Sequence, residues 1–309
     1  MSAVPPPPEA YDQDVPWHFG DPLREQRWLA EGTAAVDMRN HGVLAIEGPD
    51  RLTWLHSLTT QHLLELKPGM ATTALILSPQ GHVEHELHLI DDGSITWIIT
   101  QPGDIDSLRE YLEKMKFMLR VDVADRSDDY AVVGLPAEQS SGWKPAQEFQ
   151  ERGYAIAEVI VPRDEADEVL ARYEHAAGSW AREAMRVAAL MPRAGLDTDH
   201  RTIPNEMGWL NNAVHLDKGC YRGQETVAKV NNLGQPPRRF VLLHLDGSSD
   251  QSPRHGDTVL VDGKAVGWIG TAAQHYELGP IATAMVKRSV PTDADLRIQT
   301  ASGEVRASE

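Results

Sequence analysis

The sequence predicts a mixed α+β fold that ends in a small lobe made only of β-strands. In the first 235 residues, segments with the alternation typical of strands are interspersed with segments whose apolar residues recur at helical spacing. From Phe240 onward only short β patterns separated by turn residues remain, which favours a small barrel. A chain of 309 residues is also too long for one ordinary core, so we expect two or three lobes.

Strands and helices are both predicted in the first 136 residues. Asp50 is a plausible N-cap for a helix that places Leu52, Leu55 and Leu58 on one face. The step Asp91-Asp-Gly93 is typical of a hairpin turn between two strands. The predicted strands are residues 42–48, 71–77, 83–90, 95–100, 121–123 and 131–135, and the other predicted helices are residues 23–30 and 104–118.

The second half continues with one strand, several helices and then the β segments. The step Val261-Asp-Gly-Lys264 predicts a tight hairpin within the last lobe. The predicted helices are residues 164–175, 180–190 and 223–230, and the predicted strands are residues 154–161, 240–245, 258–261, 265–272 and 281–286.

Shifts in composition divide the chain into four parts. Four consecutive prolines and little apolar content predict a disordered or extended arm over residues 1–20. The sequence turns polar after residue 136, which indicates a lobe boundary. We therefore expect a first α+β lobe over residues 21–136, a central α+β lobe over 137–235 and a β-barrel lobe over 236–309.

Composition excludes several classes of function. No stretch approaches the eighteen or so apolar residues that a membrane span requires, and the start lacks the basic and apolar regions of a signal peptide. A single cysteine excludes an internal disulfide framework and an iron–sulfur cluster held by this chain alone, and favours a cytoplasmic location. The net charge of −17 disfavours direct binding of nucleic acid.

The only cysteine lies in the most informative segment, Lys218-Gly-Cys-Tyr-Arg-Gly-Gln-Glu225. Cys220 precedes a predicted helix start and lies between Lys218 and Arg222, and each feature favours thiolate over thiol. Glycines at 219 and 223 allow sharp turns and close approach to a ligand. From Lys218 to Arg239 the sequence has five basic residues and one acidic residue. This positive charge either suits an anionic ligand or is neutralised by acidic residues that lie nearby in the fold. We expect a reactive thiol rather than an inert buried one.

This segment resembles the signature of the YgfZ family, folate-binding relatives of the glycine cleavage T-protein (aminomethyltransferase). Shorter matches before and after it are similar in order and spacing to the T-protein family. They are Val36-Asp-Met, Ile46-Glu-Gly, Leu55-His-Ser-Leu-Thr-Thr60, Pro68-Gly69, Pro79-Gln-Gly81, residues 182–195, Ile203-Pro-Asn-Glu206 and residues 236–282. The resemblance implies three lobes around a central cavity that binds tetrahydrofolate or a one-carbon derivative. It also implies a role in the assembly or repair of iron–sulfur proteins, with tRNA thiomethylation affected indirectly.

Departures from the T-protein pattern disfavour aminomethyl transfer. An aspartate pair on a first-lobe strand of T-proteins corresponds to His85 and Glu86 here. A folate-contacting glutamate of T-proteins corresponds to Ala188, and a methyl group cannot accept a hydrogen bond from the pterin's amino edge. The Tyr-Thr-Gly-Glu loop of T-proteins is also missing near Tyr154.

Alternation along Gly81-His-Val-Glu-His-Glu-Leu-His88 separates two faces of one strand. One face, with His82, Glu84, Glu86 and His88, is predicted to be solvated rather than to bind a metal. The other face is predicted to be buried, and His85 lies on it either as a hydrogen-bonded core residue or as part of the central cavity.

The resemblance and these residues together predict the site. The predicted functional thiol and its helpers are Cys220, Lys218 and His85. The predicted folate-binding residues are Gly219, Tyr221, Arg222, Gly223, Gln224, Glu225, Arg186, Asn205 and Glu206. For Arg186 a solvated position paired with Glu183 is the alternative.

Three functions remain compatible with the sequence. The preferred one is a folate-binding maturation factor that works with iron–sulfur proteins or their assembly factors through Cys220. The others are a folate-dependent one-carbon transferase and a non-catalytic folate-binding scaffold. Whether the chain is an enzyme therefore stays open.

Overall fold

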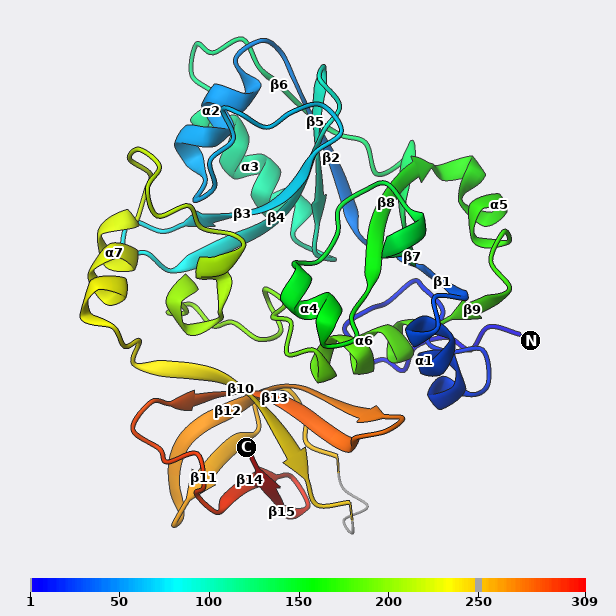
Figure 1. Cartoon of the computed structure of the whole chain (residues 1–309), viewed down its shortest axis with the longest axis vertical. Helices are drawn as coiled ribbons and strands as arrows, with labels where there is room; N and C mark the ends of the chain where they lie inside the picture. Colours follow the sequence, from blue (N-terminus) through cyan, green and yellow to red (C-terminus); the bar gives the residue numbers. More distant parts are fainter. Residues whose placement is uncertain (1, 248–251) are drawn as a thin grey trace.

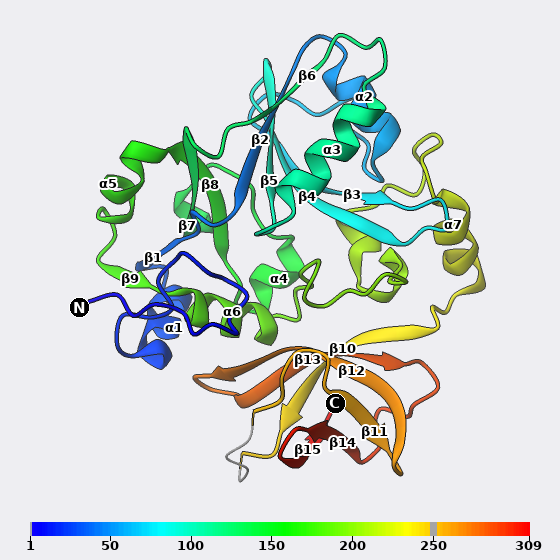
Figure 2. The ribbon, with the colours of Figure 1, turned by 180° about the vertical axis from the view of Figure 1, so that it is seen from behind.

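Two open sheets and one closed barrel make up the structure, a computed structural model that describes residues 2–247 and 252–309 (Figure 1). The five-stranded sheet has the order β3-β4-β5-β2-β6, and the four-stranded sheet has the order β8-β7-β1-β9. The barrel closes in the order β10-β13-β12-β11-β14-β15. The predicted α+β fold with a C-terminal β-barrel is confirmed. Both views place the barrel below the two sheets (Figures 1 and 2).

The five-stranded sheet and two helices form the first lobe. Its elements are β2 (Gly42–Glu47), α2 (Arg51–Leu58), β3 (Ala71–Leu77), β4 (Val83–Asp91), β5 (Ile95–Thr100), α3 (Ile105–Met115) and β6 (Asp122–Asp125). Leu87 and Leu89 of β4 pack with Leu55 of α2 and Leu108 of α3 in one apolar core. Both helices therefore cover the same face of the sheet, and the apolar alternation of the strands is directed at them.

Two local predictions in this lobe differ from the structure. Asp50 directly precedes α2 but makes no side-chain capping bond, because its carboxylate accepts from the Arg120 guanidinium instead, with an Nη2–Oδ1 distance of 2.8 Å. Helix α3 ends at Met115 rather than continuing to residue 118, since Phe117 has a φ of 46° that no α-helix continues through.

The second lobe combines segments that are far apart in the chain. Its elements are α1 (Pro22–Ala30), β1 (Ala34–Asp37), β7 (Tyr130–Pro136), α4 (Gln147–Glu151), β8 (Ile156–Pro162), α5 (Ala166–Leu170), β9 (His175–Ala177) and α6 (Ser179–Ala188). Strands β1 and β7 belong to the stretch predicted as the first lobe, yet both pair within this sheet. The boundary expected near residue 136 therefore does not separate the sheets. The helix predicted over residues 164–175 is shortened to one 3₁₀ turn and α5.

A linking segment and the barrel complete the chain. After the short 3₁₀ turns η3 (Pro204–Glu206) and η4 (Trp209–Asn211), helix α7 (Gln224–Leu233) leads into the barrel. The barrel strands are β10 (Arg238–Leu245), β11 (Thr258–Val261), β12 (Lys264–His275), β13 (Gly279–Lys287), β14 (Leu296–Thr300) and β15 (Gly303–Ser308). Val261 pairs with Lys264 across the predicted hairpin. In the part of the chain that the structure describes, no helix has the length and apolar character needed to cross a membrane.

The N-terminal arm, predicted to be disordered or extended, packs against the second lobe instead. The Trp17 and Trp180 rings stack with centroids 5.5 Å apart, and the carbonyls of Pro16 and Trp17 accept hydrogen bonds from the first N–H groups of α6. Asp12 is buried within the protein. The arm is therefore held by contacts that depend on the folded core, which a local composition argument does not detect.

Candidate functional site

The segment around Cys220 lies where α7 meets the turn between β3 and β4. A Cβ atom on Gly223 would come within 2.5 Å of the Ser78 carbonyl oxygen, and a Cβ on Gly81 would come within 2.7 Å of the Thr226 Cβ. Gly223 also has a φ of 81° at the N-cap of α7. The chain therefore needs glycine at 223 for close packing and for its backbone conformation. Cys220 precedes this contact and is exposed.

Lys218 is turned inward and holds the segment to α2. Its Nζ donates hydrogen bonds to the carbonyl oxygens of His56 and Thr59 at the end of that helix, and it lies 5.1 Å from the centroid of the Tyr221 ring. Burial lowers the pKa of Lys218 to about 8, while the two carbonyl acceptors favour the charged form. The predicted helper of the thiol thus has a structural task in this arrangement.

The other signature residues mostly serve the local fold. Gln224 accepts from the Tyr221 N–H at 3.0 Å, which closes the turn before α7 with a side-chain oxygen. Arg222 donates to Glu84 at 3.1 Å. Glu225 is exposed, and a Cβ on Gly219 would meet open space, so position 219 has no packing need for glycine.

His85 lies on the helix-covered face of β4, as the alternation predicted. Its Nδ1 is 3.0 Å from Asp104, the residue that precedes α3, and its ring tilts against Tyr111 of the same helix. His85 is therefore a hydrogen-bonded residue of the first-lobe core. It does not point to the side where the two lobes meet.

The opposite face of β4 corrects the prediction of a solvated surface. Glu86 and His88 are 4% and 2% exposed. The Glu86 carboxylate accepts from the Ala194 N–H at 3.1 Å. The His88 ring stacks flat on Trp143 with centroids 3.6 Å apart, and its Nδ1 lies 2.6 Å from Glu158 of β8. The face is buried at Glu86 and His88 because it meets the second lobe there, whereas Glu84 is exposed and His82 partly exposed, as predicted.

The remaining predicted residues lie in two different places. Asn205 donates to the Val227 carbonyl oxygen at 3.1 Å, which joins η3 to α7. The Glu206 carboxylate accepts a hydrogen bond of 2.7 Å from Arg238, which is the first residue of β10. Arg186 is 1% exposed and not solvated, and its guanidinium binds Asp197 at 2.7 Å as well as Glu183 at 3.0 Å. These contacts position the segments and the helix rather than present groups to solvent.

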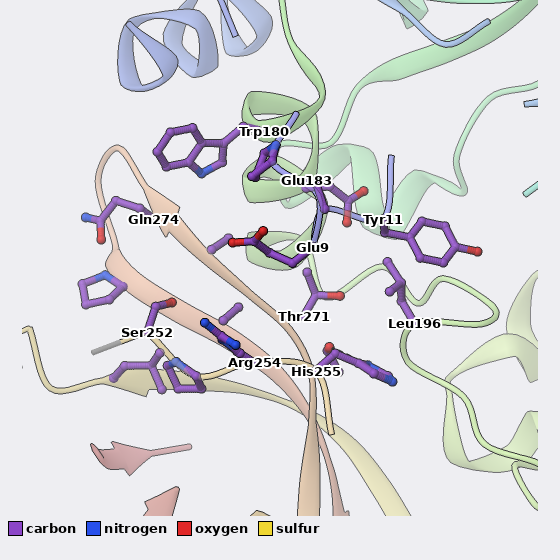
Figure 3. Close-up of a pocket in the computed structure, with 18 of the residues that line it drawn as sticks. Glu9, Tyr11, Trp180, Glu183, Leu196, Ser252, Arg254, His255, Thr271 and Gln274 are labelled. Atoms are coloured by element: carbon purple, nitrogen blue, oxygen red, sulfur yellow. Dashed lines mark hydrogen bonds between the residues drawn. The ribbon is translucent and has the colours of Figure 1, made fainter. Parts of the chain in front are cut away.

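A large pocket opens where the arm, α6 and the barrel meet (Figure 3). Its volume is about 950 Å³, which is in the range of sites for drug-sized ligands. In Figure 3 Glu9 and Glu183 lie at its centre, Trp180 at one end, and Arg254 on the barrel side. The other polar or aromatic lining residues are Tyr11, Asp12, Trp17, Asp246, Ser252, His255, Thr271 and Gln274. Carboxylates, ring faces and a guanidinium therefore surround one space.

None of the predicted site residues lines this pocket. Arg186 alone among them reaches its wall, since it donates to Thr271 at 2.7 Å and to Glu183. The signature segment and the pocket lie on different elements, because α7 packs on the first lobe whereas the pocket is walled by the arm, α6 and β12. The structure thus brings together residues that the sequence analysis did not combine.

A buried network of charges lies directly beneath the pocket. Asp12 and Glu183 line the pocket and also bind Arg193, whose guanidinium is 2.6 Å from Asp12 and 2.8 Å from Glu183. Burial alone would raise the pKa of Asp12, but Arg193 holds that pKa well below its usual range. The members of this central network are Asp12, Glu86, His88, Glu158, Arg182, Glu183, Arg186, Arg193 and Asp197.

His88 and Glu158 carry charge inside this network. Burial would lower the pKa of His88, but the carboxylates of Glu158 and Glu86 outweigh it and raise that pKa to about 9. In turn burial would raise the pKa of Glu158, and the His88 ring lowers it to about 2. The pair is therefore an imidazolium and a carboxylate at neutral pH. Among residues 2–247 and 252–309, no three His, Cys, Asp or Glu side chains are arranged to hold a metal ion.

One sequence signal could have pointed to this network. Helix α6 carries Arg182, Glu183 and Arg186 among alanines and other apolar residues, and all three charged side chains are buried. Charged residues so closely spaced on an apolar helix indicate a buried ion-pair network as well as a solvated face. Asp12 and Arg254 gave no local signal, because their place depends on contacts between distant segments.

Two family models match the chain. The GCVT N-terminal domain matches residues 8–140, and the glycine cleavage T-protein C-terminal barrel domain matches residues 238–308. An aminomethyltransferase of Nostoc sp. is 24% identical and covers 92% of this chain and 86% of its own length. An aminomethyltransferase of Geobacillus kaustophilus is 24% identical with coverages of 90% and 85%. A putative chloroplastic transferase of Arabidopsis thaliana is 23% identical with coverages of 81% and 65%.

The fold is shared with a solved structure. Glycine cleavage system aminomethyltransferase T from Bartonella henselae superposes with a TM-score of 0.79 at 18% sequence identity. The match covers 97% of this chain and 91% of that one. The similarity includes the lobes and the barrel together.

Proposed function

We propose that this chain, which combines the two domains of the GcvT-like superfamily, binds a reduced folate in the pocket between the arm, α6 and the barrel. Two of the relatives described above are named aminomethyltransferases, and the resemblance of the signature segment to folate-binding relatives of that family implies tetrahydrofolate. The observation that carries the proposal is the pocket itself, because its volume of about 950 Å³ and its mixed lining suit a ligand of this size and chemistry.

The lining residues fit the chemical groups of a folate. Glu9 and Glu183 offer carboxylate oxygens, which accept from the amino edge of a pterin. Trp180 offers a ring face for the flat pterin or benzoyl groups. Arg254, which forms no ion pair with another described residue, suits a carboxylate of the glutamate tail. A reduced folate would supply nitrogen atoms that carry a one-carbon unit.

Glu183 can supply the carboxylate that Ala188 lacks. Ala188 cannot accept a hydrogen bond, but Glu183 lies on the same helix and lines the pocket. Arg186 and Arg193 hold its two oxygens at 3.0 and 2.8 Å, so the carboxylate is fixed and charged before a ligand arrives. This arrangement supports folate binding without the carboxylate that the resemblance had led us to expect.

Thermal denaturation with and without tetrahydrofolate tests the binding. A ligand that binds only the folded chain raises its melting temperature, by an amount that grows with ligand concentration. We expect a rise that saturates. An unchanged melting temperature at millimolar ligand would contradict the proposal.

The finer role that we propose is the maintenance of iron–sulfur proteins, with Cys220 as the functional thiol. Its support is the resemblance of Lys218-Gly-Cys-Tyr-Arg-Gly-Gln-Glu225 to the YgfZ signature, together with the exposure of Cys220. An exposed thiol near a helix start is accessible to a partner protein. The resemblance implies that the partner is an iron–sulfur protein or its assembly factor, and the net charge of −17 disfavours nucleic acid.

Loss of the thiol tests this role separately from folate binding. We expect Cys220→Ala to bind tetrahydrofolate like the unaltered chain but to fail to restore iron–sulfur enzyme activity in cells that lack the protein. Cys220→Ser serves as a matched variant without a thiolate, and it should fail in the same way. Full restoration by either variant would refute a functional thiol and leave the folate proposal standing.

A one-carbon transferase is the alternative that one observation favours. Glu86 corresponds to a member of the aspartate pair of T-proteins, and its carboxylate lies on the face of β4 that meets the second lobe. This alternative would be supported if the unaltered chain consumed a methylene-folate donor and the Glu86→Gln variant did not.

A further inference from the structure

Five buried polar atoms of adjoining side chains have no hydrogen-bond partner among the described protein atoms. Each side chain is at least nine-tenths buried, and leaving such an atom without a hydrogen bond destabilises the fold. The atoms are His41 Nε2, His88 Nε2, Tyr154 Oη, Glu158 Oε1 and Arg182 Nε. Native proteins contain only a few such atoms per 100 residues, so five of them gathered in one place indicate a bound polar molecule.

These atoms belong to one place in the fold. Arg182 Nη2 lies 3.6 Å from Glu158 Oε1, and His88 Nε2 lies 3.7 Å from Glu86 Oε1, both just beyond hydrogen-bond reach. Glu158 joins the two pairs through its other oxygen, which is 2.6 Å from His88 Nδ1. The buried Tyr154 and His41 side chains interact electrostatically with both Arg182 and Glu158.

The unpaired atoms offer both donors and acceptors. Arg182 Nε–H can only donate, and Glu158 Oε1 can only accept. His41 Nδ1 is 3.1 Å from the Asn40 side-chain oxygen, so Nδ1 carries the proton of the neutral ring and Nε2 accepts. His88 Nδ1 faces Glu158, and the Nε2–H of the imidazolium donates. The Tyr154 hydroxyl does either. A cage of this kind suits neither a metal cation nor an anion.

We propose that these five side chains form an enclosed site for water, a small neutral molecule that donates and accepts at once. One water bonds two to four groups, so two molecules satisfy the five atoms. The site lies at the seam between β4 of the first lobe and β8 and α6 of the second, beneath the pocket assigned to folate. Its argument does not depend on that assignment. Water here would link the lobes beside the direct hydrogen bond between His88 and Glu158.

A crystal structure of the full chain at a resolution that shows ordered water is the direct test. We expect at least one water within hydrogen-bond distance of both Glu158 Oε1 and one of the unpaired donors. A dry site, or side chains that pair directly with one another, would overturn the proposal.

The substitution Tyr154→Phe provides a second test in solution. If the hydroxyl bonds an enclosed water, its loss lowers the melting temperature by about 1–2 °C, the shift expected for the loss of one hydrogen bond in a chain of this size. Tyr173→Phe is the control, because Tyr173 is only partly buried and its loss of a hydroxyl should leave the melting temperature unchanged. An unchanged or raised melting temperature for Tyr154→Phe would overturn the proposal.

Discussion

His88 keeps its proton although it is buried at the seam between the lobes. The carboxylates of Glu158 and Glu86 outweigh burial and raise its pKa from 6.5 to about 9. A group whose pKa is raised by folding contributes stability that is fully present below its unfolded pKa. That contribution is then lost as the pH rises through the folded pKa. His88 should therefore stabilise the fold at pH 6 and contribute nothing above about pH 9.

The substitution His88→Gln tests this pH dependence. The stability of the unaltered chain should fall between pH 6.5 and about 9, by an amount on the order of 3 kcal/mol from this residue. In the His88→Gln variant the free energy of unfolding should lack this fall with pH, because the glutamine side chain does not titrate. Urea denaturation at a series of pH values measures both. The exposed His244→Gln is the control and should keep the full slope. Equal slopes for His88→Gln and the unaltered chain would contradict the assignment.

At the scale of elements, the start of α7 and the β3–β4 turn depend on each other. Gly223 has a φ of 81° and its backbone lies against the Ser78 carbonyl, so any side chain there meets both strain and a clash. Gly219 lies in the same segment without either constraint.

We expect Gly223→Ala to lower stability by about 1–3 kcal/mol, because the backbone of α7 must shift away from the turn. Gly219→Ala, a matched change four residues away, should be neutral. Thermal denaturation compares them, and complementation in cells shows whether displacement of α7 also disturbs Cys220. A neutral Gly223→Ala would mean that α7 does not dock on the turn as described.

The elements that were predicted correctly are those whose structure follows from residues close together in the sequence. The strand Ala71–Leu77 and the hairpin at Val261–Lys264 follow from alternation and turn chemistry, which need no distant partner. Strand β1 was missed because three of its four residues are buried on pairing with β7 and β9, so the strand shows no alternation. The solvated face predicted for β4 was wrong at Glu86 and His88 for a similar reason. A polar residue pattern does not reveal that a second lobe covers it.

At the scale of the molecule, the pocket could not be predicted from local pattern. Its walls come from residues 7–17, residues 180–196 and the barrel, which are brought together only when the arm, the second lobe and the barrel pack. The family resemblance predicted a folate site but directed attention to the signature around Cys220, which lies on other elements. The fold was therefore predictable in outline, whereas the position of the ligand site required the tertiary structure.

The measurement that tests the central claim most directly is tetrahydrofolate affinity for two arginine variants, determined by titration calorimetry. Arg254 lines the pocket, whereas Arg222 lies in the signature segment and binds Glu84. We expect Arg254→Ala to weaken binding about tenfold or more, since a charge-assisted hydrogen bond contributes about 1.5–3 kcal/mol. Arg222→Ala should leave the affinity unchanged. Weakened binding in Arg222→Ala with full affinity in Arg254→Ala would contradict the account and place the folate beside Cys220.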